Sequence, residues 1–234
     1  PAIVGAKPSS VKISVSLTVL RTGLYTRPKV PNNRSEGKHP PAPEAKSSER
    51  RDEILDAAGQ LFSRRGFHAT SMRDLAKAVN LQGGSLYAHI DSKEELLFEL
   101  VNRAAAEFIA SAEAVPTDLP AKERLTRLVR GHLEVIVHEL PNATVFFHEW
   151  KFLSPELQAK IPAPRDRYEG YWRRAIEDGV KTGEFELEDV RLATLFALSA
   201  LNWTYQWYRP GGKLSLAALS KRYSGMILSA LEAR

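Results

Sequence analysis

The sequence contains no cysteine and no long uninterrupted run of apolar residues. Without cysteine, the chain cannot form a disulfide, a thiolate metal site or a thiol nucleophile. No stretch approaches the roughly 18 apolar residues that a membrane-crossing helix requires, and the alternating residues 11–20 are too polar for a signal-peptide core. We therefore expect a cytoplasmic protein without a membrane partner.

The excess positive charge lies in one short part of the chain. The 234 residues carry a formal net charge of +5, but residues 1–47 hold eight basic and two acidic residues, with seven of the 14 prolines. The remaining residues, 48–234, hold 25 basic and 26 acidic residues. A basic, proline-rich segment of low hydrophobicity buries too little apolar surface to offset its conformational entropy. The composition predicts a disordered arm over residues 1–47.

From residue 48 onward, the apolar residues repeat with the period of an amphipathic helix, and no segment alternates like a strand. Ser48 is the expected start of the first helix and Gly66 its end. Ser71 and Asp74 are spaced as a capping box that opens a second helix, and Ser92 caps a long one. The expected all-α part has helices at about residues 48–65, 71–79, 85–90, 93–113, 120–139, 142–153, 155–182 (interrupted by its prolines), 188–208 and 214–233.

Residues 70–96 hold two short predicted helices joined by a turn, in the proportions of a helix-turn-helix. The first helix presents apolar residues to a core that it shares with Leu86 and Ile90 of the second. The outward-facing residues around the second helix are Gln82, Gly83, Ser85, Tyr87 and His89. A short helix with a compact polar face fits the major groove of DNA. Periodicity alone agrees equally well with an ordinary helical hairpin.

Four phrases follow one another in order within residues 48–97: AAGQLFSRRGFHATS at 57–71, MRDLA at 72–76, SLYAHI at 85–90 and SKEELL at 92–97. Together they resemble the DNA-binding domain of the tetracycline-repressor (TetR) family of transcriptional regulators. The resemblance implies an all-α protein with an N-terminal helix-turn-helix DNA-binding domain over residues 48–97. It implies a helical ligand-binding and dimerisation domain over residues 98–234.

The resemblance also implies which residues meet double-stranded DNA. The expected DNA-binding residues are Ser71, Arg73, Gln82, Gly83, Ser85, Tyr87, His89 and Lys93. Ser71, Tyr87 and Lys93 are expected at phosphates, which position the protein without reading sequence. Arg73 is expected at a guanine edge or a phosphate, and the others along the recognition helix. A solvated Lys93 and a His89 that packs on the scaffold are the alternatives.

Two places depart from the common pattern of the family. Asn80 stands where glycine is usual before the turn, and asparagine tolerates the left-handed conformation. Gly83 and Gly84 stand where a larger residue usually precedes glycine. Adjacent glycines weaken a helix start by about 1 kcal/mol each relative to alanine, and they let the backbone approach DNA closely. Operator preference therefore cannot be transferred from a relative.

Aromatic residues concentrate after residue 100, where 15 of the 20 aromatics and all four tryptophans lie. Aromatics at helical spacing form a core more often than a pocket, but an apolar cavity between helices is also a common small-molecule site. The expected ligand-binding residues are Phe146, Phe147, Trp150, Tyr168, Tyr171, Trp172, Arg173, Trp203 and Trp207. The resemblance places a homodimer interface on the last two long helices, and two-fold symmetry predicts a palindromic operator.

Three C-terminal stretches, at residues 148–153, 165–170 and 202–212, resemble one branch of the TetR family. That branch responds to acyl-CoA thioesters of fatty-acid, sterol or aromatic-acid degradation. The resemblance implies an acyl-CoA effector whose acyl chain enters an aromatic cavity. The CoA phosphates would then meet an arginine from the set Arg165, Arg167, Arg173 and Arg174, although these residues are equally consistent with a solvated helix face.

Enzymatic and metal sites are not expected. His148 and Glu149 begin like the zinc motif H-E-x-x-H, but Phe152 occupies the position of the second histidine. We predict no catalytic residue, no metal and no cofactor, and a homodimeric repressor released from its operator by a small-molecule effector. The alternatives are a regulator answering a hydrophobic drug or another lipid, a non-specific architectural DNA-binding protein, and a helical lipid-binding protein that uses no DNA.

Overall fold

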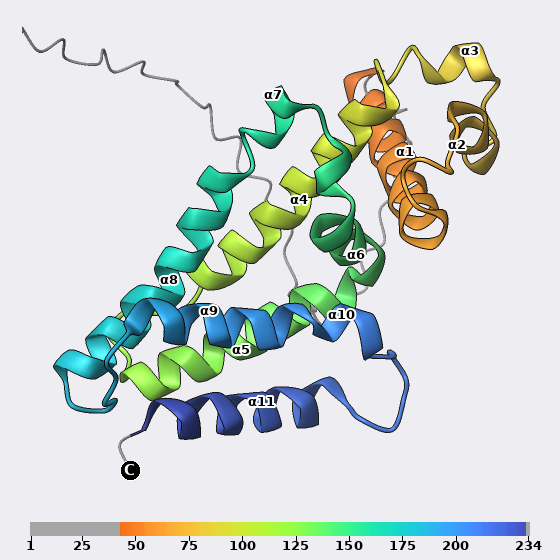
Figure 1. The fold of residues 1–234 in the computed structure, drawn as a ribbon. Helices are drawn as coiled ribbons and strands as arrows, with labels where there is room; N and C mark the ends of the chain where they lie inside the picture. Colours follow the sequence, from red (N-terminus) through yellow and green to blue (C-terminus); the bar gives the residue numbers. More distant parts are fainter. Residues whose placement is uncertain (1–42, 233–234) are drawn as a thin grey trace, which may run out of the picture. The chain divides into compact units, whose positions relative to one another are not determined.

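The structure, a computed structural model, describes residues 43–232 of the chain. Of the disordered arm predicted over residues 1–47, residues 1–42 lie outside the described residues. Within the described range all regular structure is helical and no strand occurs (Figure 1). The predicted all-α class is therefore confirmed. No helix in this range combines the length and the apolarity that a membrane crossing requires.

The helices of the described range fall into two packed groups. In chain order they are α1 (Pro43–Arg65), α2 (Met72–Ala78), α3 (Gly83–Leu86), α4 (Lys93–Glu113), α5 (Ala121–His138), α6 (Leu140–His148), the 3₁₀ turn η1 (Trp150–Phe152), α7 (Pro155–Gln158), α8 (Pro162–Lys181), α9 (Val190–Asn202), α10 (Thr204–Trp207) and α11 (Leu216–Leu231). Helix α1 packs on α2, α4 and α6, and α2 packs on α3. Helix α11 packs on α5 and α9 (Figure 1).

The predicted helix caps are present. Gly66, which ends α1, has a φ of 85°, a left-handed conformation that glycine adopts without strain. At the start of α2, the Asp74 amide donates to Ser71 Oγ over 3.1 Å, and the Ser71 amide donates back to the Asp74 carboxylate over 2.9 Å. Ser92 caps α4 by accepting from the Glu95 amide over 3.0 Å. These local contacts confirm the predicted starts of α2 and α4.

The bounds of two helices differ from the prediction. Helix α1 begins at Pro43 rather than Ser48, because a proline is tolerated in the first turn of a helix. Helix α3 ends at Leu86, and the chain continues to Ile90 as turns in which the amides of His89 and Ile90 both donate to the Leu86 carbonyl over 3.0 and 3.2 Å. A four-residue helix that opens with two glycines has little propensity to extend further.

Longer predicted segments are divided. The segment 155–182 is interrupted before Pro162, as predicted, and gives α7 and α8. The segment 142–153 becomes α6, which begins at Leu140, and η1. The segment 188–208 breaks at Trp203 into α9 and α10.

Two clusters of buried side chains hold the helices together. The first cluster includes Ile54, Phe62, Leu75, Leu86, Leu97, Leu100, Phe108, Ile136, Val145 and Phe146. The second includes Leu125, Val129, Leu133, Trp172, Ile176, Phe185, Leu201, Leu219 and Ile227. The predicted shared core of the helix-turn-helix is confirmed, since Leu75 and Leu86 are fully buried. The first cluster continues past residue 97 without a break into α6.

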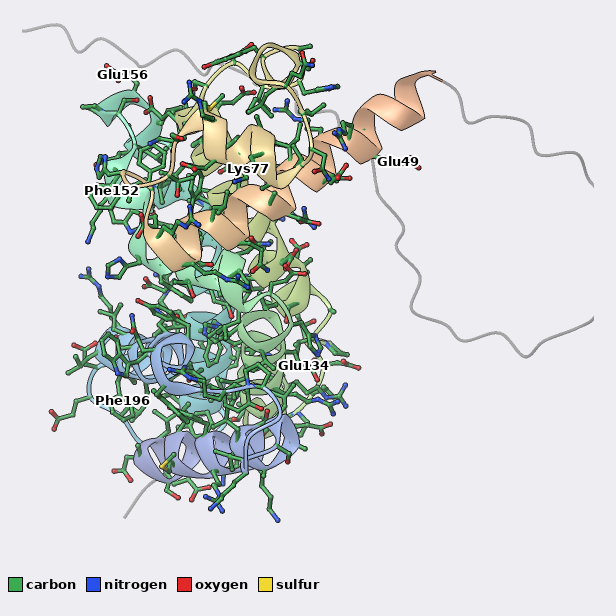
Figure 2. The ribbon with its side chains drawn as sticks, turned by 90° about the vertical axis from the view of Figure 1, so that its right-hand side faces the viewer. Glu49, Lys77, Glu134, Phe152, Glu156 and Phe196 are labelled. Atoms are coloured by element: carbon green, nitrogen blue, oxygen red, sulfur yellow. The ribbon has the colours of Figure 1, made fainter. Side chains whose placement is uncertain are left out.

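Several large apolar side chains remain exposed on the last two long helices. On α9, Leu192, Leu195 and Phe196 are 64%, 40% and 53% exposed, and on α11 Met226 is 59% exposed. Figure 2 shows Phe196 on the outside of its helix. Exposed apolar side chains gathered on neighbouring helices are typical of a surface that another protein molecule covers.

We predict opposite effects on stability from alanine at two helical glycines. At Gly179 in α8, a Cβ atom would lie 2.1 Å from Phe185 Cδ2 and 2.9 Å from Ala121 Cβ, whereas at Gly84 in α3 nothing lies within 4 Å. Gly179→Ala is expected to lower the free energy of unfolding by about 1–3 kcal/mol through overpacking. Gly84→Ala is expected to raise it by up to about 1 kcal/mol. Urea unfolding at one fixed protein concentration measures both, and equal effects would contradict the close packing of α8.

Candidate nucleic-acid interface and ligand pocket

The outer face of α2 and α3 carries most of the predicted DNA-binding side chains. Ser71, Arg73, Gln82, Ser85 and Tyr87 are all exposed. The Tyr87 ring, 56% exposed, is the largest of these side chains, and folding alone gives no reason to leave an aromatic ring in water. The surface is therefore polar and accessible, with one protruding ring.

The turn that joins α2 to α3 adopts the conformation expected from its sequence. Asn80 has a φ of 53°, which confirms the predicted left-handed residue. Gly83 is the first residue of α3. His89, in the turn after α3, is half-buried. The structure thus brings the predicted recognition residues to one short stretch but leaves His89 less accessible than its neighbours.

Lys93 faces the protein more than the sequence indicated. Its Nζ donates to the carbonyls of Phe67 and Thr70 over 2.8 and 2.9 Å, and it lies 4.3 Å from the centroid of the Phe67 ring. Two of the three N–H groups of the ammonium are therefore used to hold the loop between α1 and α2. The phosphate contact expected of Lys93 stays a prediction, which the third N–H would have to make.

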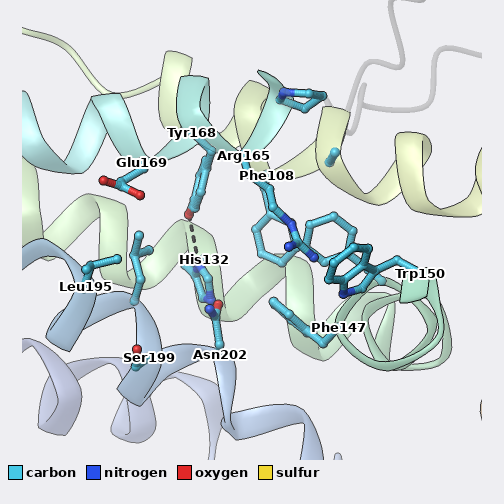
Figure 3. A pocket seen from close by; sticks show the side chains of 14 residues that line it. Phe108, His132, Phe147, Trp150, Arg165, Tyr168, Glu169, Leu195, Ser199 and Asn202 are labelled. Atoms are coloured by element: carbon cyan, nitrogen blue, oxygen red, sulfur yellow. Dashed lines mark hydrogen bonds between the residues drawn. The ribbon is translucent and has the colours of Figure 1, made fainter. Parts of the chain in front are cut away.

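A cavity of about 360 Å³ lies between α4, α5, α6, α8 and α9 (Figure 3). The predicted ligand residues Phe146, Phe147, Trp150 and Tyr168 line it. The lining also includes Ala105, Phe108, His132, Pro164, Arg165, Glu169, Leu195, Leu198, Ser199 and Asn202. Most of this surface is aromatic or aliphatic, and the volume falls in the range of about 300–1,000 Å³ that small-molecule sites occupy.

The structure places the other five predicted ligand residues outside this cavity. Trp172 is fully buried in the second core. The Tyr171 hydroxyl donates to the Glu113 carboxylate over 2.7 Å, and Arg173 is exposed beside Glu177. Trp203 and Trp207 are 63% and 43% exposed. Aromatic spacing marks the helices around a cavity, but it does not say which face of each helix points inward.

Two polar residues of the cavity wall go beyond the predicted ligand contacts. His132 was not predicted, and Arg165 was one of four candidate arginines. His132 is 1% exposed, and its Nδ1 lies 2.8 Å from Tyr168 Oη. Burial lowers the pKa of His132 to about 3, so the ring is neutral near pH 7. The Arg165 guanidinium lies 4.3 Å from the centroid of the Trp150 ring, and burial lowers its pKa from the usual value. Arg165 is the residue of the four candidate arginines that lines the cavity.

The segment that follows α6 connects the cavity to the helix-turn-helix. Glu149, 7% exposed, precedes the cavity residue Trp150, and its Oε2 accepts from the Phe67 amide over 2.7 Å. Phe152 stacks on Phe67 with 6.5 Å between ring centroids. The Ser154 amide donates to Glu94 at the start of α4 over 2.6 Å, which lowers the pKa of that carboxyl. Residues 149–154 thus hold the α1–α2 loop from the side of the cavity.

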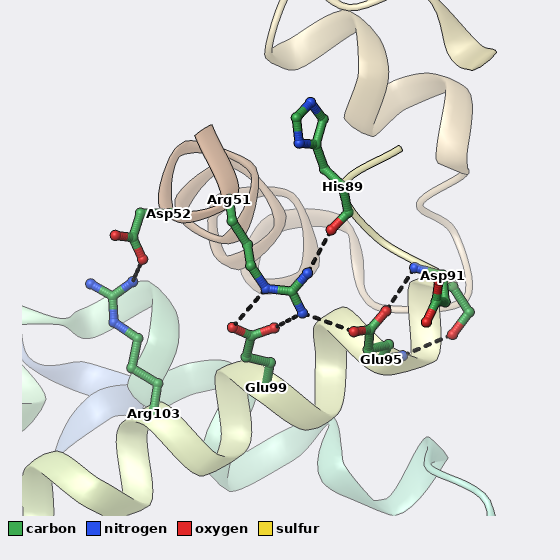
Figure 4. A network of polar contacts seen from close by, with 8 residues as sticks. Arg51, Asp52, His89, Asp91, Glu95, Glu99 and Arg103 are labelled. Atoms are coloured by element: carbon green, nitrogen blue, oxygen red, sulfur yellow. Dashed lines mark hydrogen bonds and ion pairs between the residues drawn. The ribbon is translucent and has the colours of Figure 1, made fainter. Parts of the chain in front are cut away.

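A second polar network ties the turn after α3, at residues 89–91, to α1 and α4 (Figure 4). Arg51 on α1 contacts Glu95 over 2.8 Å and Glu99 over 2.6 Å, and it donates to the His89 carbonyl over 2.5 Å. The hydrogen bonds that Arg51 donates to Glu99 and Glu95 raise the pKa of Arg51 above its usual value. The hydrogen bond from Arg51 and one from the Asp91 amide lower the pKa of Glu95. No pattern in the sequence indicated this network, because its members are far apart along the chain.

The exposed polar face of a helix-turn-helix, followed by a helical part with an apolar cavity, is typical of helical DNA-binding regulators. Comparison with known families agrees with this class. Residues 54–100 match the family described as bacterial regulatory proteins, tetR family. Residues 118–231 match the tetracyclin repressor-like, C-terminal domain.

Individual relatives cover most of the chain. The HTH-type transcriptional repressor KstR2 of Rhodococcus jostii is 33% identical over 196 residues, which cover 82% of this chain and 96% of the relative. The TetR family transcriptional regulator PfmR from Thermus thermophilus has a similar structure, with a TM-score of 0.72, 37% identity, and coverage of 78% of this chain and 100% of that one. AibR, solved in complex with isovaleryl coenzyme A and operator DNA, has a TM-score of 0.69 and 26% identity over 78% of this chain and 97% of its own.

The chain therefore belongs to the tetR family of bacterial regulatory proteins. It is a transcriptional regulator with a helix-turn-helix and not an enzyme. This confirms the family and the fold that the resemblance implied.

We predict that Arg51→Met lowers the free energy of unfolding by about 1–2 kcal/mol, because charge-assisted hydrogen bonds to two half-buried carboxylates are lost. The folded-state pKa of Glu95 lies below its ordinary value of 4.5, so the stabilisation is fully present above pH 4.5 and is lost as the pH falls further through the folded-state pKa. Urea unfolding of both proteins between about pH 7 and pH 3 measures this difference.

Arg103→Met is the matched control, since Arg103 on α4 also pairs with a carboxylate of α1, the exposed Asp56, over 3.2 Å. We expect a loss of at most about 1 kcal/mol from an exposed pair of this kind. If the two variants were equally stable at neutral pH, the network around Arg51 would be a surface ion pair and nothing more.

Proposed function

We propose that the protein is a homodimeric, ligand-responsive repressor that binds a palindromic operator and is released by an acyl-CoA thioester. The observation that carries the proposal is the Glu149 contact, which joins a cavity-lining segment directly to the loop before α2. A regulator of this kind acts on the chromosome in the cytoplasm. A hydrophobic drug or another lipid remains the alternative effector.

The DNA contacts of the proposal rest on the exposed face of α2 and α3. Arg73, Gln82, Ser85 and Tyr87 are accessible there. Asp52 and Asp56 on α1 pair with Arg103, so these negative charges are partly neutralised within the protein. Phosphate contacts from the exposed face and the N-terminus of α2 would set the register of the protein on the duplex. Base contacts would come from Gln82 and Ser85.

The proposed dimer would cover the exposed apolar residues of α9 and α11. Leu192, Phe196 and Met226 are each more than half exposed, while their neighbours Leu198 and Ile227 are buried in the second core. A helix with one face in the core and another apolar face outside is suited to a two-fold interface between copies of the chain. Two copies would present two recognition segments to a palindromic site.

The cavity supports an effector with a hydrophobic part of moderate size. Its volume of about 360 Å³ suits an acyl group, and a whole CoA thioester would have to extend beyond it. Arg165, half-buried over Trp150, is a cation at the cavity wall that suits an anionic part of the effector. That AibR was solved with isovaleryl coenzyme A and operator DNA supports the same effector class for this chain.

Release from DNA would follow from movement of the segment after α6. An acyl group between Phe147, Trp150 and Phe108 would displace these rings from the positions they hold in the structure. Because Glu149 adjoins Trp150 and binds the Phe67 amide, such a displacement would move the α1–α2 loop. A 100-fold loss of operator affinity requires the effector to favour the non-binding state by about 2.7 kcal/mol.

Replacement of Tyr87 tests the role of the exposed face. We expect Tyr87→Ala to weaken binding about 5- to 10-fold on all DNA sequences alike, because a phosphate contact carries no base information. Tyr87→Phe, which removes only the hydroxyl, is the matched variant. Fluorescence anisotropy with operator and scrambled duplexes measures both. A loss confined to one base change in the operator would assign Tyr87 to base reading instead.

The whole proposal is tested by a gel-shift series on the DNA upstream of the protein's own gene. We expect retardation that requires a specific palindrome and is relieved by palmitoyl-CoA or isovaleryl-CoA. Retardation that depends neither on sequence nor on the thioesters would favour a non-specific architectural role. Relief by a hydrophobic drug alone would favour the alternative effector.

Two variants sharpen the same series. Glu149→Ala is expected to bind the thioester but to show a smaller release from DNA, because the contact with the Phe67 amide is lost. Glu156→Ala, which alters an exposed carboxylate on α7, is expected to behave like the unchanged protein. An unchanged release in Glu149→Ala would remove this contact from the coupling.

A further inference from the structure

We propose that His132 is a polar anchor for the effector: it hydrogen-bonds an uncharged oxygen, a keto or hydroxyl group, carried within the hydrophobic part of the ligand. The inference rests on the proposed function of the cavity as the effector site. It makes the effector class more specific, since a plain saturated chain has no such oxygen.

The first observation is the fixed position of the imidazole. His132 lies on α5 with its ring 4.9 Å from the ring of Phe108 and 6.1 Å from that of Trp172. Its Nδ1 is bound to Tyr168 Oη over 2.8 Å. In Figure 3, His132 lies between Tyr168 and Asn202 on one wall, across from Phe147 and Trp150. The ring therefore has little freedom to turn its second nitrogen elsewhere.

The second observation is that this second nitrogen is unused. His132 lines the cavity and is 1% exposed. Within residues 43–232, its Nε2 has no hydrogen-bond partner. Buried side-chain nitrogens are nearly always paired, and an unpaired one is costly to the folded state. A ligand atom in the cavity would supply the missing partner.

The chemistry of the site selects a neutral oxygen. The imidazole is uncharged near pH 7, so it offers no cation to a carboxylate or a phosphate. The cavity wall also holds Glu169, which disfavours a second carboxylate in the same space. When the Tyr168 hydroxyl donates to Nδ1, Nε2 carries the proton and can donate to a ketone; in the other tautomer Nε2 accepts from a hydroxyl.

The rest of the lining limits where the oxygen can sit on the ligand. Phe147 and Trp150 line the wall across from His132 (Figure 3), and Phe146 also lines the cavity. Phe108 lies beside the His132 ring, with 4.9 Å between the ring centroids. The effector must therefore place apolar atoms against these rings and its oxygen against α5. This arrangement suits an oxo- or hydroxy-substituted acyl chain or an oxygenated ring system, in which the polar atom is internal rather than terminal.

The test compares matched ligands on the full-length protein. Calorimetry is carried out with decanoyl-CoA and with decanoyl-CoA thioesters that bear one keto group at successive carbons. We expect at least one keto thioester to bind about 10-fold more tightly than decanoyl-CoA. His132→Phe is expected to abolish that preference, so that the keto thioester and decanoyl-CoA bind the variant with equal affinity. No preference in the unchanged protein, or a preference that survives in His132→Phe, would overturn the inference.

A second arm separates this inference from the acyl-CoA proposal. If no thioester binds, the thermal stabilisation by 5-decanone is compared with that by decane. Greater stabilisation by 5-decanone that is absent in His132→Phe would support the anchor and contradict the acyl-CoA effector. Equal stabilisation by both probes would contradict the anchor.

A spectroscopic readout covers the case in which His132→Phe does not fold. In the unchanged protein with ¹⁵N-labelled histidine, binding of 5-decanone is expected to shift the Nε2 signal of His132, assigned by comparison with His132→Gln. Phe108→Leu, which alters the apolar wall without a polar change, is expected to weaken both probes alike. A bound ketone that leaves the Nε2 signal unmoved would overturn the inference.

Discussion

The loop between α1 and α2 is held at Phe67 by charged side chains from two parts of the chain. The Lys93 ammonium, at the start of α4, donates a hydrogen bond to the Phe67 carbonyl. The Glu149 carboxylate, after α6, accepts one from the Phe67 amide. Hydrogen bonds to ionised groups are stronger than those between neutral groups. The position of α2, and therefore of the recognition segment, depends on where these two side chains lie.

Helix α4 carries this constraint along the molecule. Its first turn supplies Lys93 to the loop, Glu94 to the chain after η1 and Glu95 to Arg51. The same helix supplies Phe108 to the cavity, about 22 Å further along the helix axis at 1.5 Å per residue. The aromatic wall of the cavity and the loop before α2 are thus both in contact with the same helix.

Features that depend on neighbouring residues were predictable from the sequence. The capping box at Ser71, the left-handed Asn80 and the glycine end of α1 each follow from the conformational preferences of a few adjacent residues. The family phrases located the recognition segment, because they combine such local signals in a fixed order. The roles of individual residues at DNA remain predictions.

Features that depend on distant residues were not predictable. Whether α8 turns Tyr168 or Trp172 toward the cavity depends on how α8 packs against α5 and α9, and helical spacing serves both residues equally. The inward position of Lys93 depends on two carbonyls more than 20 positions earlier in the chain. His132 stands on the apolar face of α5, where its chemistry is set entirely by what packs around it.

The continuity of the first core has a consequence for how such regulators can be recombined. Helix α1 approaches α6 so closely at Gly59 that a Cβ atom there would lie 2.1 Å from Asn142 Oδ1. The helix-turn-helix part therefore shares a fitted surface, and not merely a linker, with the C-terminal domain. A chimera that takes the helix-turn-helix part from a relative would therefore also need the matching surface of α6 from that relative. The two parts thus pack as a single unit.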